Sequence, residues 1–273
     1  MYMIEIKNLT RDYGNGKGIF DLELTINKGE VFGFLGPNGA GKTTTIRHLM
    51  GFIKPQQGSC MIDGLDCWQQ SWKLQHEIGY LPGEIAFFND MSGEEYLKFI
   101  SSYRKVTKNN RQQELITRFE LNPKGKIKKM SKGMKQKLGI VAAFMHDPNI
   151  LILDEPTSGL DPIMQNKFVE LINEEKARGK TILMSSHIFE EVEKTCDRIG
   201  IIKDGHLVAL DDSANMRMHH VKSYIVSLEN IQVAKEFASS FNGEIMEDDP
   251  RKVKVEVKRS LEDIFLNYYG GNR

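Results

Sequence analysis

Two segments of the sequence carry residues whose types and spacing suit phosphate chemistry. Residues 36–43 read Gly-Pro-Asn-Gly-Ala-Gly-Lys-Thr, which fits the pattern G-x-x-x-x-G-K-[ST]. In such a loop the glycines let backbone N–H groups line an anion site, and the next helix directs its positive end there. Lys42 is expected to reach the β- and γ-phosphates of a nucleoside triphosphate, and the Thr43 hydroxyl to bind Mg²⁺. The residues predicted to bind ATP are Gly36, Pro37, Asn38, Gly39, Ala40, Gly41, Lys42, Thr43 and Thr44.

The second segment is an apolar run, residues 150–153, that ends in two adjacent acids, Asp154 and Glu155. Burying a charge is costly unless something compensates it. One explanation is that acids at the end of a strand are exposed to solvent. In proteins with a phosphate loop, however, a second buried strand commonly ends in an Asp that holds Mg²⁺. Asp154 is therefore predicted to share the metal with Thr43, and Glu155, on the other side of the chain, to act as general base toward the attacking water.

These side chains require buried strands to position them. Residues 31–35 are a short apolar run before the phosphate loop, which is typical of a buried parallel strand. Residues 150–154 form a second such strand and residues 181–184 a third. The order of strand, loop and helix around Lys42 predicts an α/β fold with a P-loop NTPase core and a mostly parallel sheet.

The overall composition excludes several other classes of protein. The 273 residues are 40% apolar and carry 37 basic and 37 acidic side chains, so net charge gives no argument for a nucleic-acid partner. The apolar runs are far shorter than the roughly 20 residues that span a bilayer, and the first residues alternate like a strand rather than a secretory signal. Three cysteines without paired spacing are expected to be reduced thiols.

Further motifs narrow the class of P-loop protein. Residues 130–136, Met-Ser-Lys-Gly-Met-Lys-Gln, lie just upstream of the Asp-Glu strand and resemble the signature L-S-G-G-Q-x-Q of ATP-binding cassette ATPases. Residues 158–161 match the D-loop of that family, His187 resembles its switch histidine, and Tyr13 stands where the family keeps an aromatic that stacks on adenine. The resemblance covers about the first three quarters of the chain, with the motifs in the family's order.

The resemblance implies a dimer of nucleotide-binding domains that face each other head to tail. Each ATP would lie between the phosphate loop of one chain and the signature of the other. Ser131 is expected to cap the following helix and to meet the γ-phosphate across the interface. ATP would then close the pair and hydrolysis would reopen it. The resemblance assigns Ser131, Lys132, Gly133 and Met134 to the signature, Asp161 to the D-loop, and Glu155 and His187 to catalysis.

Two departures from the family pattern stand out. Lys132 and Met134 replace the usual Gly and Gln of the signature, and this variant resembles that of the drug and antibiotic exporter branch. A lysine there could pair with the phosphate or loosen the closed state. The strand at residues 78–82 is followed by Gly83 and Glu84 instead of the Q-loop glutamine, so Glu84 is assigned that role.

The expected organisation is a nucleotide-binding domain, residues 1–215, followed by a small α/β region, residues 216–273. The resemblance adds an N-terminal antiparallel β-subdomain and a helical subdomain at about 87–145 that couples ATP to a membrane partner. In the last region the patterning predicts strands at 222–228 and 252–258 and helices at 231–241 and after Ser260. A metal on the adjacent His219 and His220 is not expected.

These inferences combine into a cytoplasmic ATPase subunit of a drug or antibiotic exporter, attached to the membrane through a separate permease. An alternative is a soluble clamp acting on nucleic acid or ribosomes, and another is a kinase. Seven lysines at 124–137 would suit nucleic acid. Because no aromatic residues interleave them, a solvated basic rim is favoured, and no nucleic-acid partner is expected. The transported compound, the choice between homodimer and heterodimer, and the role of the last region stay open.

Overall fold

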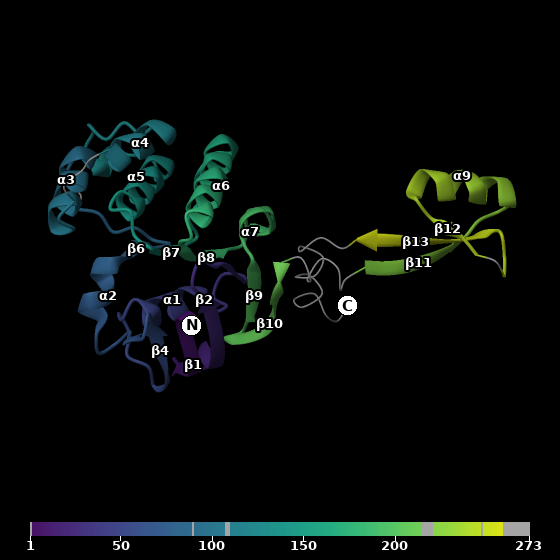
Figure 1. The fold of residues 1–273 in the computed structure, drawn as a ribbon, viewed down its shortest axis with the longest axis horizontal. Coiled ribbons are helices and arrows are strands. Elements are labelled where there is room, and N and C mark those ends of the chain that lie inside the picture. The colour runs from purple at the N-terminus through teal and green to yellow at the C-terminus, as the bar shows by residue number, and fades with distance from the viewer. Residues whose placement is uncertain (1, 89, 107–109, 214–220, 247, 259–273) are drawn as a thin grey trace. The chain divides into compact units, whose positions relative to one another are not determined.

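The computed structural model describes residues 2–88, 90–106, 110–213, 221–246 and 248–258 (Figure 1). The chain divides into two compact units, Met1–Leu210 and Asp211–Arg273. The first unit holds both segments that are predicted to carry phosphate chemistry.

A six-stranded sheet forms the centre of the first unit. The strand order is β10-β9-β3-β8-β7-β6, and the pairings of β3 with β8 and β9, of β7 with β8 and of β6 with β7 are all parallel. Every residue of β3, β7 and β8 is buried, as expected for parallel strands covered on both faces. The predicted parallel core is therefore confirmed. The strands are β3 (Val31–Leu35), β6 (Ile78–Leu81), β7 (Ile150–Asp154), β8 (Thr181–Ser186), β9 (Arg198–Lys203) and β10 (His206–Asp212).

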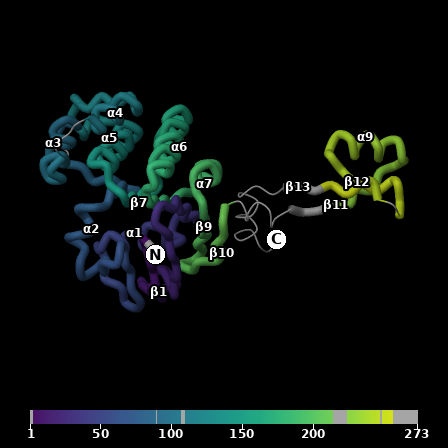
Figure 2. The backbone as a smooth tube through the Cα atoms, viewed as in Figure 1, coloured from purple at the N-terminus to yellow at the C-terminus, as the bar shows by residue number. Residues whose placement is uncertain are grey.

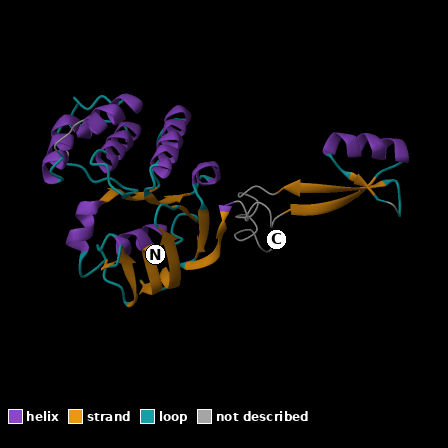
Figure 3. Cartoon of the chain, viewed as in Figure 1, coloured by secondary structure: helices purple, strands orange, loops and turns teal. Residues whose placement is uncertain are grey.

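A second, antiparallel sheet in the order β2-β1-β4-β5 comes from the N-terminal part of the chain (Figure 3). One apolar core joins it to β3 and to the helix after the phosphate loop, because Ile6, Leu22, Phe32 and Ile46 belong to a single buried cluster. The strand before the phosphate loop and the helix after it are therefore both held by the same apolar core. The elements are β1 (Tyr2–Asp12), β2 (Gly18–Asn27), α1 (Lys42–Leu49), β4 (Gln57–Ile62), β5 (Leu65–Asp66) and α2 (Ser71–Glu77).

A helical segment is inserted between β6 and β7, and its helices gather away from β1 and β4 (Figure 2). Two of them begin at serine caps: the Oγ of Ser92 accepts a hydrogen bond from Glu95 N, and that of Ser131 from Met134 N, both at 3.2 Å. Such caps satisfy N–H groups that the first turn leaves unpaired. The segment comprises α3 (Gly93–Tyr103), α4 (Asn110–Arg118), the 3₁₀ turn η1 (Ile127–Lys129) and α5 (Lys132–Phe144). It is followed beyond β7 by α6 (Pro162–Ala177), and α7 (Phe189–Thr195) follows β8.

A buried charge cluster ties α4 to α6 and to the turn before β7. Glu175 is fully buried and forms ion pairs with Arg111, with Arg178 at 3.0 Å and with Lys180 at 2.5 Å. Asp147 also pairs with Lys180 and, at 2.7 Å, with Arg178. Burial alone would raise the pKa of Asp147, but the hydrogen bonds from Arg178 and Lys180 lower that pKa to about 2.

The second unit contains a three-stranded sheet in the order β11-β13-β12 and one described helix. Ala234 of the helix packs with Val253 and Val255 of β13. The elements are β11 (Val221–Ser227), α9 (Ile231–Phe241), β12 (Glu244–Ile245) and β13 (Lys252–Lys258), so the strands and the helix predicted within 222–258 are confirmed. The predicted helix after Ser260 and the pair His219 and His220 lie outside the described residues. In the part of the chain that the structure describes, no helix has the length and apolar character needed to cross a membrane.

Candidate nucleotide site

Three neighbouring strand ends bring the predicted site residues together. β8 lies between β3 and β7, and the register pairs Leu35 with Ser186 and Asp154 with Ser185. The carboxyl ends of parallel strands meet at one edge of the sheet. The phosphate loop, the Asp-Glu pair and His187 follow these three ends in turn, so residues far apart in sequence converge on one point.

The phosphate loop ends at a helix whose first N–H groups have no side-chain cap. The N-cap of α1 is Gly41, which has φ 115° and therefore a backbone conformation that glycine adopts most readily. A Cβ at Gly36 would lie 2.6 Å from Ile202 O, so the loop packs closely against the end of β9. Uncapped N–H groups at a helix start bind anions, which is the property that a phosphate cradle requires.

Lys42 is buried, yet its ammonium is held at the mouth of the loop. Nζ donates hydrogen bonds to Gly36 O at 2.5 Å and to Pro37 O at 3.2 Å, and lies 3.2 Å from Glu155 Oε1. Its positive charge is thus placed between the phosphate loop and the predicted general base.

Asp154 is fully buried and accepts two hydroxyl hydrogen bonds. Thr43 Oγ1 donates to Oδ2 at 2.8 Å, and Ser185 Oγ donates to Oδ1 at 2.5 Å. Adjacent carboxylate and hydroxyl oxygens are the ligands that Mg²⁺ prefers, so Thr43 and Asp154 fit the predicted metal. Ser185 was not predicted as a site residue, although its position at the end of a core strand beside Asp154 was a usable signal.

Glu155 directly follows the last residue of β7 and has an unusual backbone conformation. Its φ is 48°, and its N–H bonds to Ser185 O at 3.2 Å and to Ser185 Oγ at 3.0 Å. His187 Nδ1 lies 2.5 Å from Glu155 Oε2. A left-handed conformation at a non-glycine residue stores strain that a site has to support. Here it aims the carboxylate between Lys42 and His187, where a general base is expected.

The signature segment packs on the loop that follows Glu155. Gln136, which is buried, donates from Nε2 to Glu155 O at 3.3 Å and to Pro156 O at 2.7 Å. Lys132 Nζ donates to Ser158 Oγ at 2.9 Å. Asp161 caps α6 by accepting from Met164 N at 3.0 Å. The contacts of Gln136 and Lys132 were not predicted from the sequence, although both residues stand within the signature motif.

Two other predicted residues, Tyr13 and Ser131, are exposed. Tyr13 is 51% exposed, with the Arg11 guanidinium 5.1 Å from its ring centroid. Among the described residues, no hydrogen bond or ion pair joins Ser131 or Tyr13 to the phosphate loop.

The expected Q-loop residue lies in a groove between the parallel sheet and the helical segment. Glu84 is exposed and lines a cavity of about 480 Å³ together with Tyr80, Tyr96 and Arg104. The residue that lies against Asp154 is Gly83, where a Cβ would be 3.2 Å from Oδ2. The assignment of Glu84 to the Q-loop role stays a prediction.

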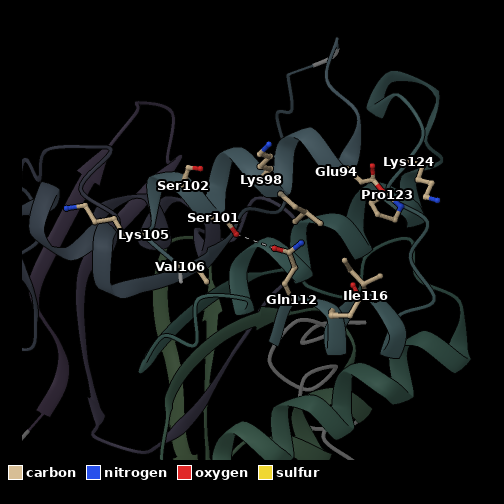
Figure 4. Close-up of a pocket in the computed structure, with 12 residues that line it drawn as sticks. Glu94, Lys98, Ser101, Ser102, Lys105, Val106, Gln112, Ile116, Pro123 and Lys124 are labelled. Carbon is tan, nitrogen blue, oxygen red and sulfur yellow. Dashed lines mark hydrogen bonds between the residues drawn. The ribbon is translucent and has the colours of Figure 1, made fainter. Parts of the chain in front are cut away.

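A larger cavity, of about 760 Å³, lies within the helical segment (Figure 4). It is lined by residues of α3 and α4, where Ser101 donates to Gln112 at 3.2 Å, and by Pro123 and Lys124. None of the predicted site residues lines it. The larger cavity and the predicted nucleotide site are therefore different places in the structure.

Comparison with known proteins gives three relevant similarities. Residues 19–158 match the family model described as "ABC transporter". The chain is 35% identical to the linearmycin resistance ATP-binding protein LnrL of Bacillus subtilis, over 78% of this chain and 70% of LnrL. It is 39% identical to the bacitracin transport ATP-binding protein BcrA of Bacillus licheniformis, over 76% of this chain and 68% of BcrA.

Solved structures agree with the fold. The dimeric post-hydrolysis structure of the ATP-binding cassette MJ0796 bound to ADP and Pi superposes with a TM-score of 0.69 at 23% identity, covering 77% of this chain and 99% of that chain. At this identity the similarity concerns the arrangement of strands and helices.

Proposed function

The chain belongs to the ABC transporter family of ATP-binding proteins, and from this premise we propose that it is the ATP-hydrolysing subunit of an exporter of drugs or antibiotics. The observation that carries the proposal is the convergence of Lys42, Asp154 and Glu155 at the carboxyl ends of β3 and β7. That arrangement provides a phosphate cradle, a metal-binding oxygen pair and a base within one buried edge.

The residues have distinct roles in this proposal. Lys42 and the uncapped start of α1 hold the phosphates. Mg²⁺ held by Thr43 and Asp154 would neutralise phosphate charge. Glu155 polarises the attacking water, and His187 orients the Glu155 carboxylate through the 2.5 Å contact. Tyr13, exposed beside Arg11, is available to stack on adenine.

The proposed assembly is a pair of such chains, each completing the other's site with Ser131, Lys132, Gly133 and Met134. The support is that Ser131 and Lys132 are exposed at the start of α5, and that the MJ0796 cassette is a dimer. The pair would open on hydrolysis, because loss of the γ-phosphate removes the signature's contact with it, which only the closed dimer makes.

The proposed membrane partner is a separate permease, bound on its cytoplasmic side. The groove that holds Glu84 between the sheet and the helical segment is the surface offered to it. The export direction and the compound class are suggested by the relatives that serve linearmycin resistance and bacitracin transport.

Glu155→Gln tests the ATPase part of the proposal. We expect this variant to bind ATP, to lose nearly all turnover and to form a dimer with ATP and Mg²⁺ in light-scattering measurements of mass, since the amide cannot accept a proton. Glu190→Gln, which changes an exposed acid on α7, is the matched control and should turn over normally. Normal ATP turnover in Glu155→Gln would show that Glu155 is not the general base. The transport part is tested by purifying the unaltered protein from membranes, and the absence of a co-purifying permease would count against it.

A further inference from the structure

Lys132 replaces a glycine of the usual signature, and the structure shows what the longer side chain contacts. Its ammonium donates a 2.9 Å hydrogen bond to Ser158 Oγ, and its methylene groups cover Gly159, where a Cβ would meet them at 3.0 to 3.3 Å. Next to it, Gly133 packs so closely that a Cβ would lie 2.8 Å from Gly159 O. The start of α5 is therefore tied to the D-loop of its own chain.

The D-loop in turn holds the predicted general base. Ser158 N donates to Glu155 O at 3.1 Å, which closes a tight turn over residues 155–158. Glu155 at the head of this turn has the positive φ of 48°, so its carboxylate direction depends on how the turn is held. One hydrogen-bonded turn of backbone therefore links Ser158 to Glu155.

We propose that Lys132 is a positioning residue for ATP hydrolysis, which holds Ser158 so that the Glu155 carboxylate is correctly directed. This inference rests on the proposed function. It adds that the signature of a chain acts on the general base of that same chain, in addition to its proposed contact with the partner's nucleotide. Binding of a phosphate at the start of α5 would thereby change the direction of the Glu155 carboxylate through Lys132 and Ser158.

The test compares Lys132→Ala, Ser158→Ala and the double variant in steady-state ATP hydrolysis. Each single change should lower kcat about three- to tenfold, because the chemical step is impaired. Ser158→Ala should also leave KM for ATP unchanged, because Ser158 is not among the proposed nucleotide contacts. The double variant should fall no further than either single variant, whereas independent effects would multiply to roughly 10- to 100-fold. Lys129→Ala, an exposed lysine just before α5, is the matched control and should match the original protein.

Three results would overturn the inference. If Lys132→Ala lowers kcat or raises KM while Ser158→Ala has no effect, Lys132 acts only through the nucleotide and not through Ser158. If the effects of the two changes multiply, or neither changes kcat, the hydrogen bond has no part in catalysis. Binding of a fluorescent ATP analogue and thermal unfolding, measured on each variant, show that the chain is folded. Failure of the unaltered protein to hydrolyse ATP would instead refute the proposed function.

Discussion

Two serine caps with the same side-chain hydrogen bond allow the signature's chemical role to be separated from its structural one. Ser131 begins α5 and Ser92 begins α3, and in each the Oγ accepts a 3.2 Å hydrogen bond from the backbone N–H three residues on. Only Ser131 belongs to the proposed nucleotide contact. We therefore compare Ser131→Ala with Ser92→Ala.

The structural cost of the two changes should be similar. Losing a serine cap costs about 1 kcal/mol, which corresponds to a fall in Tm of about 2–4 °C for a unit of this size. A hydroxyl that bonds to a charged phosphate contributes a further 1.5–3 kcal/mol or so. If Ser131 makes that contact in the step of hydrolysis, Ser131→Ala should lower ATP turnover roughly 10- to 150-fold, and Ser92→Ala should leave it within about twofold.

The assay is ATP hydrolysis by the purified chain, with thermal unfolding measured on the same samples. Equal losses of Tm with turnover lost only in Ser131→Ala would support a direct role of Ser131. Equal turnover in the two variants would refute it, since the Ser131 hydroxyl would then act only as a helix cap.

The buried charge cluster gives two further predictions. Glu175→Gln should lower the free energy of unfolding by roughly 3–5 kcal/mol, because it leaves three cations without their buried partner. Urea unfolding measures this free energy. A change below about 1 kcal/mol would show that the cluster is not needed for stability. The pKa of Asp147 is lowered from its ordinary 3.8 to about 2, so its contribution should be complete above pH 3.8 and lost as pH falls toward 2. Unfolding followed from pH 5 to pH 2 should show a shallower loss of stability in Asp147→Asn, and identical profiles would contradict the assignment.

The sequence allowed the parallel core and its boundaries to be predicted because the relevant signals are local. The strands at Val31–Leu35 and Ile150–Asp154 have the predicted limits, since polar, acidic or glycine residues bound both apolar runs. Two short motifs also placed Thr43 and Asp154 at one predicted metal site, and the structure brings Thr43 Oγ1 to 2.8 Å from Asp154 Oδ2.

Features that depend on three-dimensional approach were not predictable. Nothing in the neighbourhood of Lys132 indicates that its ammonium would reach Ser158, because that contact requires α5 to pack on the turn after β7. The positive φ of Glu155 could not be predicted from the sequence either, since Glu has no preference for that conformation. The charge cluster around Glu175 joins α4, α6 and the turn before β7, and charged residues on helices usually indicate an exposed face.

The position of β3 in the sheet has a consequence for synthesis on the ribosome. Both neighbours of this wholly buried strand, β8 and β9, are translated about 150 residues after it. At about 5–20 residues per second, the growing chain carries an unpaired apolar strand for roughly ten seconds or more. During that interval the apolar side chains of β3 can pack only on earlier elements such as β1, β2 and α1. Termination of synthesis before residue 181 should therefore yield a fragment that aggregates unless chaperones bind it.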